Sequence, residues 1–282
     1  MIQINKDINN EPKSLKKFKT EKTEKNSKSI YDQILLIKRE KDIDKKNKLR
    51  AVLRGDKHNK KGDGIFEFYV DKYDKKKLRE VLLKEQGHIC CYCMGAIFIA
   101  KEGRIERTKI EHYKPRDGNE ECEIDYDNLY LACNGKIIGC KEDDNVHKTN
   151  KDCKCDEKNK NKIKQITHCD TCKGNKGLKY IKLNELIENK ILYDSDGRIY
   201  SEDKDIDDEL NEVLNLNAKQ LKFNRMKAKE DFFNYLKKAL PIQGTWDNSL
   251  IKNQIIKCKN DVKKRPYVGI IIYFLNRKLK VQ

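Results

Sequence analysis

Cysteines in short-spaced pairs constrain the fold of this chain more than any other feature. The 282 residues include eleven cysteines, and two of the pairs are Cys90 with Cys93 and Cys169 with Cys172. A turn between two cysteines at this spacing points both sulfurs at one ion, and four such ligands in a tetrahedron form a structural zinc site. Because the N-terminus is charged and carries no apolar signal segment, the pattern predicts zinc thiolates rather than the disulfides of a secreted protein.

The predicted zinc ligands come from three segments of the chain. Cys90 and Cys93 form the first pair, and Cys133 and Cys169 form the second. The sequence leaves an alternative open, in which a different combination of ligands, or a second zinc ion, uses cysteines from a more distant set: Cys140, Cys153, Cys155 and Cys172.

An acidic residue beside a histidine lies between these cysteines, followed by an asparagine and a second acid. The residues are Glu111 with His112, then Asn128, then Asp170. Hydrolysis of a phosphodiester needs a base to deprotonate water and a cation to offset the charge that builds on the phosphate. Histidine titrates near neutrality, and carboxylates are preferred ligands of Mg²⁺ and Mn²⁺. The pattern therefore indicates metal-assisted hydrolysis of phosphodiester bonds.

These motifs, in this order, resemble the HNH nucleases, and more narrowly the PtuB-type HNH proteins of bacterial Septu and retron-associated anti-phage systems. The similarity is dense from about residue 84 to 180 and discontinuous elsewhere. Outside the central motifs it includes the first residues of the chain and a later pair of segments: Met1 to Lys6, Pro12, Leu15, Leu214 to Asn217, and Asn224 with Arg225.

The resemblance implies a role for each residue of the acid-histidine pattern. His112 would be the general base and Glu111 a ligand of a catalytic Mg²⁺ or Mn²⁺. Asn128 would brace the loop that carries His112, and Asp170 would stand where many relatives have a histidine ligand. Strand, strand and helix would carry these residues in turn, as a ββα-metal finger.

The last motif leaves second choices and one further contact. His168 and Asn175 are second choices for the catalytic metal ligand, and Cys172 is a second choice for the zinc. Lys173 could contact a phosphate, although a lysine on a helix more often faces solvent.

The predicted fold is α+β, with the zinc-stapled finger between two mainly helical regions. The boundaries are 1–86 for a basic N-terminal region, 87–180 for the nuclease finger with its cysteine-rich insertion, and 181–282 for a C-terminal region. No apolar run approaches the roughly 20 residues of a membrane span, so we expect a cytoplasmic protein without a membrane partner.

Local patterns predict several further elements. One or two helices are expected from Ser29 to Arg54, another over 74–86, and a strand over 65–70. Residues 180–200 are β-like with a turn at 194–197. Asn217 is a plausible N-cap for a helix to about Leu240, and a last apolar run, 267–275, favours helix over strand.

Positive charge is concentrated at the two ends of the chain. The net charge is +17; residues 1–86 carry 25 Lys and Arg against 15 Asp and Glu, and residues 251–282 carry 9 against 1. Basic flanks around a near-neutral centre are suited to holding the phosphates of nucleic acid. The competing interpretation is that these lysines are ordinary solvated faces.

The sequence thus predicts a metal-dependent endonuclease, with zinc as a structural ion and DNA or RNA as substrate. The resemblance implies that it is the effector of an anti-phage system and acts beside a PtuA-like ATPase. The alternative is a non-catalytic zinc module that docks nucleic acid or the ATPase.

Overall fold

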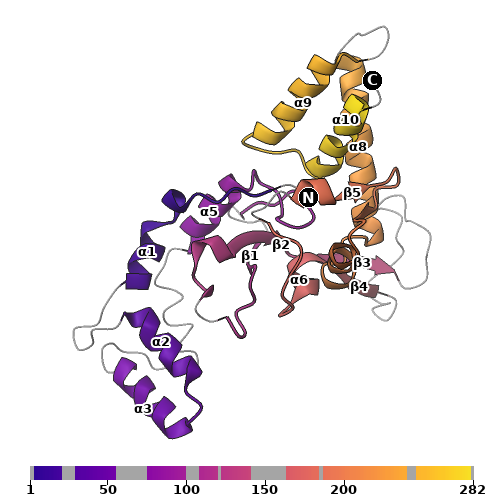
Figure 1. Ribbon diagram of the computed structural model, residues 1–282. Coiled ribbons are helices and arrows are strands. Elements are labelled where there is room, and N and C mark those ends of the chain that lie inside the picture. The colour runs from indigo at the N-terminus through magenta and orange to yellow at the C-terminus, as the bar shows by residue number, and fades with distance from the viewer. Residues whose placement is uncertain are drawn as a thin grey trace.

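Helices lie at both ends of the molecule, and short antiparallel strand pairs lie between them (Figure 1). The computed structural model describes residues 3–20, 29–54, 75–99, 108–119, 122–140, 163–183, 187–239 and 246–280. The predicted mixed α+β class is confirmed. The strand predicted over 65–70 lies outside the described residues, as do Cys153 and Cys155.

The N-terminal region is helical in its described parts. Ser29 caps α2 in a capping box, in which its side chain accepts from the Asp32 N–H while the Asp32 carboxylate accepts from the Ser29 N–H. Two helices therefore occupy the range for which one or two were predicted, and the helix predicted over 74–86 is also found. The elements are η1 (Ile8–Asn10), α1 (Lys13–Thr20), α2 (Ile30–Arg39), α3 (Ile43–Arg54) and α5 (Lys75–Glu85).

The central region consists of two antiparallel strand pairs and a short helix. Strand β1 (Thr108–His112) pairs with β2 (Leu129–Cys133), and the 3₁₀ turn η3 (Tyr126–Asn128) leads into β2. Strands β3 (Lys136–Cys140) and β4 (Ile163–Thr167) form a second pair. The five-residue helix α6 (Cys169–Lys173) follows. The order is strand, strand, hairpin and helix, so the hairpin separates the second strand from the helix that carries Asp170.

A buried glutamine joins the end of α5 to β2. The Gln86 amide donates to the carbonyl oxygens of Ile89 (3.0 Å) and Leu131 (2.8 Å), and its oxygen accepts from the Leu131 N–H at 2.6 Å. Because Gln86 is only 2% exposed, these hydrogen bonds satisfy a polar side chain that would otherwise be costly to bury. They hold the segment that begins at Ile89 against the central strand pair.

The C-terminal region is a β-hairpin followed by helices. A turn at 194–197 was predicted, and the hairpin closes there, with the Asp194 N–H donating to Arg198. The β-like range is otherwise shorter than expected. The elements are η5 (Ile187–Lys190), β5 (Leu192–Tyr193), β6 (Ile199–Tyr200), α7 (Lys204–Asp208), the π-helical turn η6 (Glu209–Val213), α8 (Lys219–Ala239), α9 (Asn248–Asn260) and α10 (Val268–Lys280).

Two helix predictions in this region have different outcomes. The last apolar run is helical, as α10. The long helix α8 is also found, but the prediction that Asn217 caps it is wrong. The Asn217 side chain instead pairs with β6, accepting from the Ile199 N–H at 2.9 Å and donating to the Ile199 carbonyl at 2.8 Å. None of the helices in the described segments combines the length and hydropathy of a membrane span.

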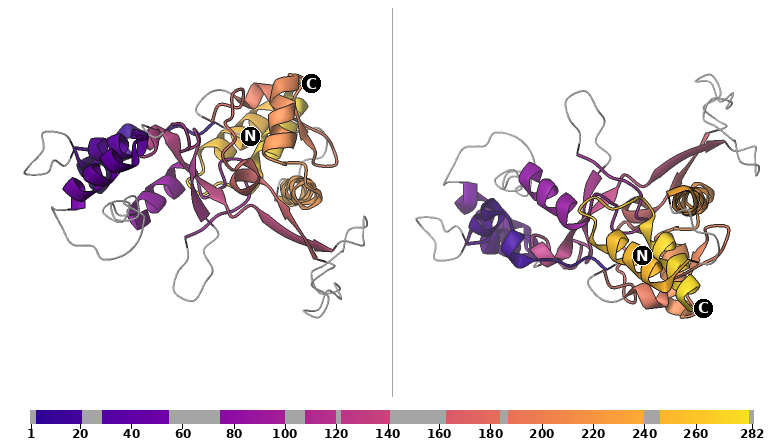
Figure 2. Two further views of the ribbon diagram at one scale, coloured as in Figure 1. Left: turned by 90° about the horizontal axis from the view of Figure 1, so that it is seen from below. Right: turned by 90° about the horizontal axis from the view of Figure 1, so that it is seen from above.

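The first residues of the chain cross the molecule. They start beside the C-terminal helices and run to α1 at the opposite end (Figure 2). The Ile4 N–H donates to the Leu183 carbonyl at 2.8 Å. The Lys6 ammonium lies 3.3 Å from the Glu85 carboxylate and 3.7 Å from the centre of the Tyr126 ring. The N-terminal arm thus ties the three regions together.

Candidate metal and catalytic site

Four cysteines from distant parts of the sequence meet in one cluster. The sulfurs of Cys90, Cys93, Cys133 and Cys169 all lie within 4.8 Å of one another. Two of the separations, Cys90 to Cys169 and Cys93 to Cys133, are 3.9 Å. A tetrahedron with zinc–sulfur bonds of about 2.3 Å places its sulfurs roughly 3.8 Å apart. The four cysteines therefore could hold a metal ion such as zinc, as the sequence predicted.

Backbone geometry builds the first half of this cluster. Cys90 to Cys93 form a turn that ends at Met94, whose φ is +60°. The Gly95 N–H then donates to the Cys93 sulfur at 3.4 Å, and the Cys133 N–H donates to the Cys90 sulfur at 3.3 Å. Hydrogen bonds from backbone N–H groups stabilise thiolate charge, which suits metal ligands.

The other half of the cluster comes from β2 and from the start of α6. Cys169 is fully buried and has a positive φ of 54°, and its N–H donates to the Leu214 carbonyl at 2.8 Å. The His168 Nδ1 atom lies 3.0 Å from the Cys169 sulfur. His168 therefore faces the thiols, and this contact does not support its second-choice role as a ligand of the catalytic ion.

The thiols of the cluster have perturbed pKa values. Burial raises the pKa of Cys169 well above its usual range. Burial also raises the pKa of Cys90, but hydrogen bonds from Cys133 and Cys169 outweigh it and leave that pKa well below its usual range. The cluster thus favours a thiolate at one position, and a bound cation would be required to stabilise four.

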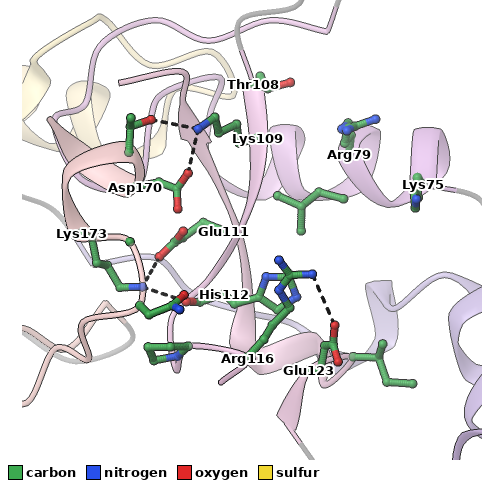
Figure 3. Close-up of a pocket in the computed structure, with 16 residues that line it drawn as sticks. Lys75, Arg79, Thr108, Lys109, Glu111, His112, Arg116, Glu123, Asp170 and Lys173 are labelled. Atoms are coloured by element: carbon green, nitrogen blue, oxygen red, sulfur yellow. Dashed lines mark hydrogen bonds and ion pairs between the residues drawn. The ribbon is translucent and has the colours of Figure 1, made fainter. Parts of the chain in front are cut away.

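The acid-histidine residues line a separate pocket with a volume of about 890 Å³. Figure 3 shows the Glu111 and Asp170 carboxyl groups pointing toward one another, with His112 below them on the end of β1. Two further residues, Lys75 and Arg79 of α5, line the same pocket. The structure therefore brings Glu111, His112 and Asp170 together, although 57 residues and a hairpin separate His112 from the helix that carries Asp170.

Glu111 is the most deeply buried acid of the pocket, with 1% of its surface exposed. Its carboxyl group accepts from the Tyr92 hydroxyl at 2.7 Å and lies 2.8 Å from the Lys173 ammonium. Burial, followed by a hydrogen bond with Asp170, raises the pKa of Glu111 to about 8 against the opposing effect of Lys173. The two carboxyl groups are therefore close enough to share a proton or a cation.

Two lysines offset the charge of these carboxylates. The Lys173 ammonium is 1% exposed, and besides Glu111 it contacts the His112 carbonyl, to which it donates at 3.1 Å. The Lys109 ammonium lies 3.4 Å from the Asp170 carboxylate and donates to Thr171 at 2.9 Å. Lys173 was predicted to contact a phosphate or to face solvent; its side chain is instead buried between two parts of the site.

His112 is held in its neutral form. Burial lowers the pKa of its imidazole to about 4, and the positive charge of Arg116 lowers it further, against a hydrogen bond to the Glu123 backbone. Arg116 itself lies 3.6 Å from the Glu123 carboxylate. A neutral imidazole has a lone pair free to accept a proton, but a pKa this far below 7 makes it a weaker base than the near-neutral value that suits a general base.

Asn128 joins the loop after His112 to the start of β2. Its side-chain oxygen accepts from the Lys114 N–H at 2.7 Å, and its amide donates to the carbonyls of Lys114 (3.2 Å) and Cys122 (2.9 Å). The Tyr113 N–H donates to the Asn128 carbonyl at 2.9 Å. These contacts are of the kind expected from a brace for the His112 loop.

Other predicted residues lie at the margins of both sites. Asn175 is exposed and lines the pocket. Cys172 is outside the four-cysteine group found among the described residues, and the Cys140 side chain is not described, so a second zinc site is not tested. Tyr92 and Lys109 contact the acids but were missed from the sequence, where only their proximity to Cys93 and Glu111 marked them. No family model matches the chain, and no curated protein matches its sequence.

Proposed function

We propose that the protein is a metal-dependent endonuclease of the HNH type that hydrolyses phosphodiester bonds in nucleic acid. One observation carries the proposal: the neutral imidazole of His112 and the carboxyl groups of Glu111 and Asp170 line one open pocket. Hydrolysis needs a base and a cation site side by side.

Each residue of the pocket has a task in this mechanism. His112 takes the proton from the attacking water, since its ring is unprotonated at neutral pH. Glu111 and Asp170 offer an oxygen donor set that suits Mg²⁺ or Mn²⁺. A bound divalent ion would offset charge on the scissile phosphate and the leaving oxygen. Asn128 keeps the His112 loop in position through its three side-chain hydrogen bonds.

Basic residues on the walls of the pocket support a polyanionic substrate. Lys75 and Arg79 project from α5, and Arg116 lies on the loop after β1 (Figure 3). Their positive charge would attract the phosphates that flank the scissile bond, a contribution that does not depend on base sequence. This agrees with the excess of positive charge at both ends of the chain.

The four-cysteine cluster would hold zinc as a structural ion, because four protein ligands leave no open position for chemistry. By resemblance, the nuclease would be the effector of a bacterial anti-phage system and would act with a PtuA-like ATPase. The helical ends of the molecule would then provide the partner surface, away from the pocket.

The alternative function is a zinc module that docks nucleic acid or the ATPase without cutting. It is favoured by the two ion pairs, Lys173 with Glu111 and Lys109 with Asp170, because they already balance the carboxylate charge. A catalytic ion would have to compete with these ammonium groups.

A cleavage assay separates the two functions. Purified protein is incubated with plasmid DNA, single-stranded DNA and RNA in Mg²⁺ or Mn²⁺, beside His112→Ala. We expect cleavage that requires the divalent ion and is lost in the variant, while binding of the same substrates persists. Equal cleavage by parent and variant would remove His112 from the mechanism. Binding by the parent without any cleavage would favour the docking module.

A further inference from the structure

A buried arginine in the C-terminal region has no acidic partner among the described residues. Arg225, on α8, is 0% exposed. Its Nε donates to the Gly197 carbonyl at 2.6 Å, and its Nη2 donates to the Leu216 carbonyl at 2.8 Å and to the Asn217 side chain at 3.1 Å. Every one of these acceptors is neutral. Burial of a guanidinium without a counter-ion costs several kcal/mol, so the position of Arg225 needs a compensating negative charge.

One end of the same guanidinium is unsatisfied. The Nη1 atom of Arg225 is buried and has no hydrogen-bond partner. In native proteins such an atom is rare and has a specific cause, such as an ordered water, an ion or a functional constraint. The polar contacts of Arg225 therefore fix its orientation but do not explain its charge.

The four-cysteine cluster with zinc bound would lack positive charge. Four thiolates around one Zn²⁺ carry a net charge of −2, and three of the four cysteines are buried. A buried anion of this kind is stabilised by positive charge outside the ligand sphere. Among the buried charged residues of the described chain, which are Glu11, Glu111, Glu123, Lys173, Glu209 and Arg225, only Lys173 and Arg225 are cations, and Lys173 is paired with Glu111.

Short connections link the segments around Arg225 to this cluster. The Leu214 carbonyl accepts from the Cys169 N–H at 2.8 Å, two residues before the Leu216 carbonyl that accepts from Arg225. The preceding residue, Asn224, donates to the Tyr267 hydroxyl at 3.0 Å. A Cβ atom on Gly95 would contact both that hydroxyl (3.2 Å) and the Cys93 sulfur (3.4 Å).

The electrostatics of Arg225 agree with this placement. Burial lowers its pKa, whereas the ionised forms of Tyr193, Cys93 and Tyr267, followed by Cys169, would raise it. Burial raises the pKa values of both tyrosines, so they are neutral at pH 7 and only the thiolates can supply negative charge. Two of those four groups are predicted zinc ligands. The segments involved, Leu214 to Asn217 and Asn224 with Arg225, are those that the sequence marked but that the nuclease mechanism leaves unused.

We propose that Arg225 is the buried counter-charge of the zinc tetrathiolate, so that the C-terminal region contributes to retention of the metal without supplying a ligand. The inference rests on the zinc part of the proposed function and is independent of cleavage. It makes Arg225 a positioning residue for the metal site, and its effect should appear in zinc affinity rather than in the chemical step.

A matched pair of substitutions in the full-length protein tests the charge. Arg225→Gln removes it and keeps a hydrogen-bonding side chain, whereas Arg225→Lys keeps the charge and loses the planar fork. We expect Zn²⁺ affinity, measured by competition with a chromophoric chelator, to fall about 10- to 100-fold in Arg225→Gln. Arg225→Lys should stay within about threefold of the parent. An equal loss in both variants would overturn the proposal, since the fork and not the charge would then matter.

A second experiment changes the charge of the metal site itself. Cys133 is the predicted ligand with partial exposure. Cys133→His replaces one thiolate with a neutral imidazole, so the net charge of a zinc complex would change from −2 to −1. The affinity lost through Arg225→Gln should be several-fold smaller in this background than in the parent. A loss of the same size in both backgrounds would show that Arg225 acts through packing and would contradict the proposal that it acts through its charge.

Two outcomes separate this inference from the proposed zinc site. A parent protein that binds no Zn²⁺ overturns both. A parent that binds Zn²⁺ with an affinity unchanged in Arg225→Gln overturns the inference alone. If Arg225→Gln does not fold, Arg225→Lys decides: zinc binding near the parent value supports the counter-charge, and a variant that fails to fold or loses zinc contradicts it.

Discussion

The cysteine cluster and the carboxylate pocket are built from the same few segments but differ in almost every physical property. Cys169 and Asp170 are neighbours on α6, and one faces the cluster while the other faces the pocket. The cluster is largely buried, and all four of its sulfurs come from the protein. The pocket is open, about 890 Å³ in volume, and lined by mixed charge. A five-residue helix therefore serves two sites by presenting successive side chains in different directions.

The charge balance of the two sites indicates whether each needs a metal ion to keep its structure. In the pocket, Glu111 keeps its proton at neutral pH and Lys109 pairs with Asp170, so the local structure stands without a divalent ion. In the cluster no lysine or arginine is recorded in direct contact with the sulfurs of the described cysteines. Metal should consequently be necessary for the fold at the cluster and necessary only for chemistry at the pocket.

The largest expected effect comes from removal of a cluster ligand. Cys90→Ser should lower the free energy of unfolding by about 4 kcal/mol or more, because bound zinc contributes directly to folding. Zinc content and chemical denaturation measure this. Cys172→Ser, on α6 beside the ligand Cys169 but outside the cluster, is the control and should stay within about 1 kcal/mol of the parent. A stable parent protein that contains no zinc would contradict the prediction that the cluster needs metal for its fold.

The second effect concerns rate instead of stability. His112→Ala should reduce cleavage by a factor of about 10² to 10⁴, the usual contribution of a positioned general base. Its melting temperature should change little, and affinity for nucleic acid should persist and weaken as salt rises. Melting curves and single-turnover cleavage on one preparation check both halves. If the variant lost stability as Cys90→Ser does, the distinction between pocket and cluster would fail.

Removal of the brace should have an intermediate effect. Asn128→Ala deletes three side-chain hydrogen bonds in a buried position and should cost about 1 to 3 kcal/mol of stability, together with part of the activity. Asn119→Ala, in the same loop with its strongest contact to the Pro115 carbonyl, is the matched control and should cost less. Urea denaturation of both variants gives the comparison; an equal cost would mean that Asn128 does not brace the loop.

The last expected effect is a slope of stability with pH. The pKa of Glu111 is raised to about 8, so between about pH 5 and 8 the folded protein keeps a proton that the unfolded chain releases. Stability should therefore fall as pH rises through this window, by up to about 1.4 kcal/mol per pH unit. Urea midpoints without added Mg²⁺ should show the slope in the parent and lose it in Glu111→Gln. The same slope in the parent and in Glu111→Gln would show that the titrating group is not Glu111.

The cluster could be predicted from sequence because zinc chemistry fixes the type of its ligands. Spacing selected Cys90 with Cys93, whereas Cys133 and Cys169 were chosen from their place in the order of motifs, and the four sulfurs converge. Apolar periodicity predicted α5, but over α10 it fitted helix or strand, and helix was preferred. Chemistry that specifies its own ligands leaves a strong signal even across a long insertion.

The residues that surround the two sites left no such signal. Lys173 has the same local sequence whether it faces solvent or pairs with Glu111, because burial depends on segments far away in the chain. Asn217 has the residue type of a helix cap, yet a neighbouring strand with unpaired backbone groups competes for its side chain and wins. Predictions from local pattern fail where a tertiary partner offers a better hydrogen bond.

Two backbone hydrogen bonds bear on the order in which parts of the protein can fold. The Tyr267 N–H donates to the Met94 carbonyl at 2.7 Å, and the Lys264 N–H donates to the Gly87 carbonyl at 2.9 Å. Both join the segment from Gly87 to Met94, which holds the first cysteine pair, to residues more than 170 positions later in the sequence. Contacts of such long sequence separation form late in folding. The cysteine cluster can therefore reach its final geometry only after residues 264–267 have been synthesised.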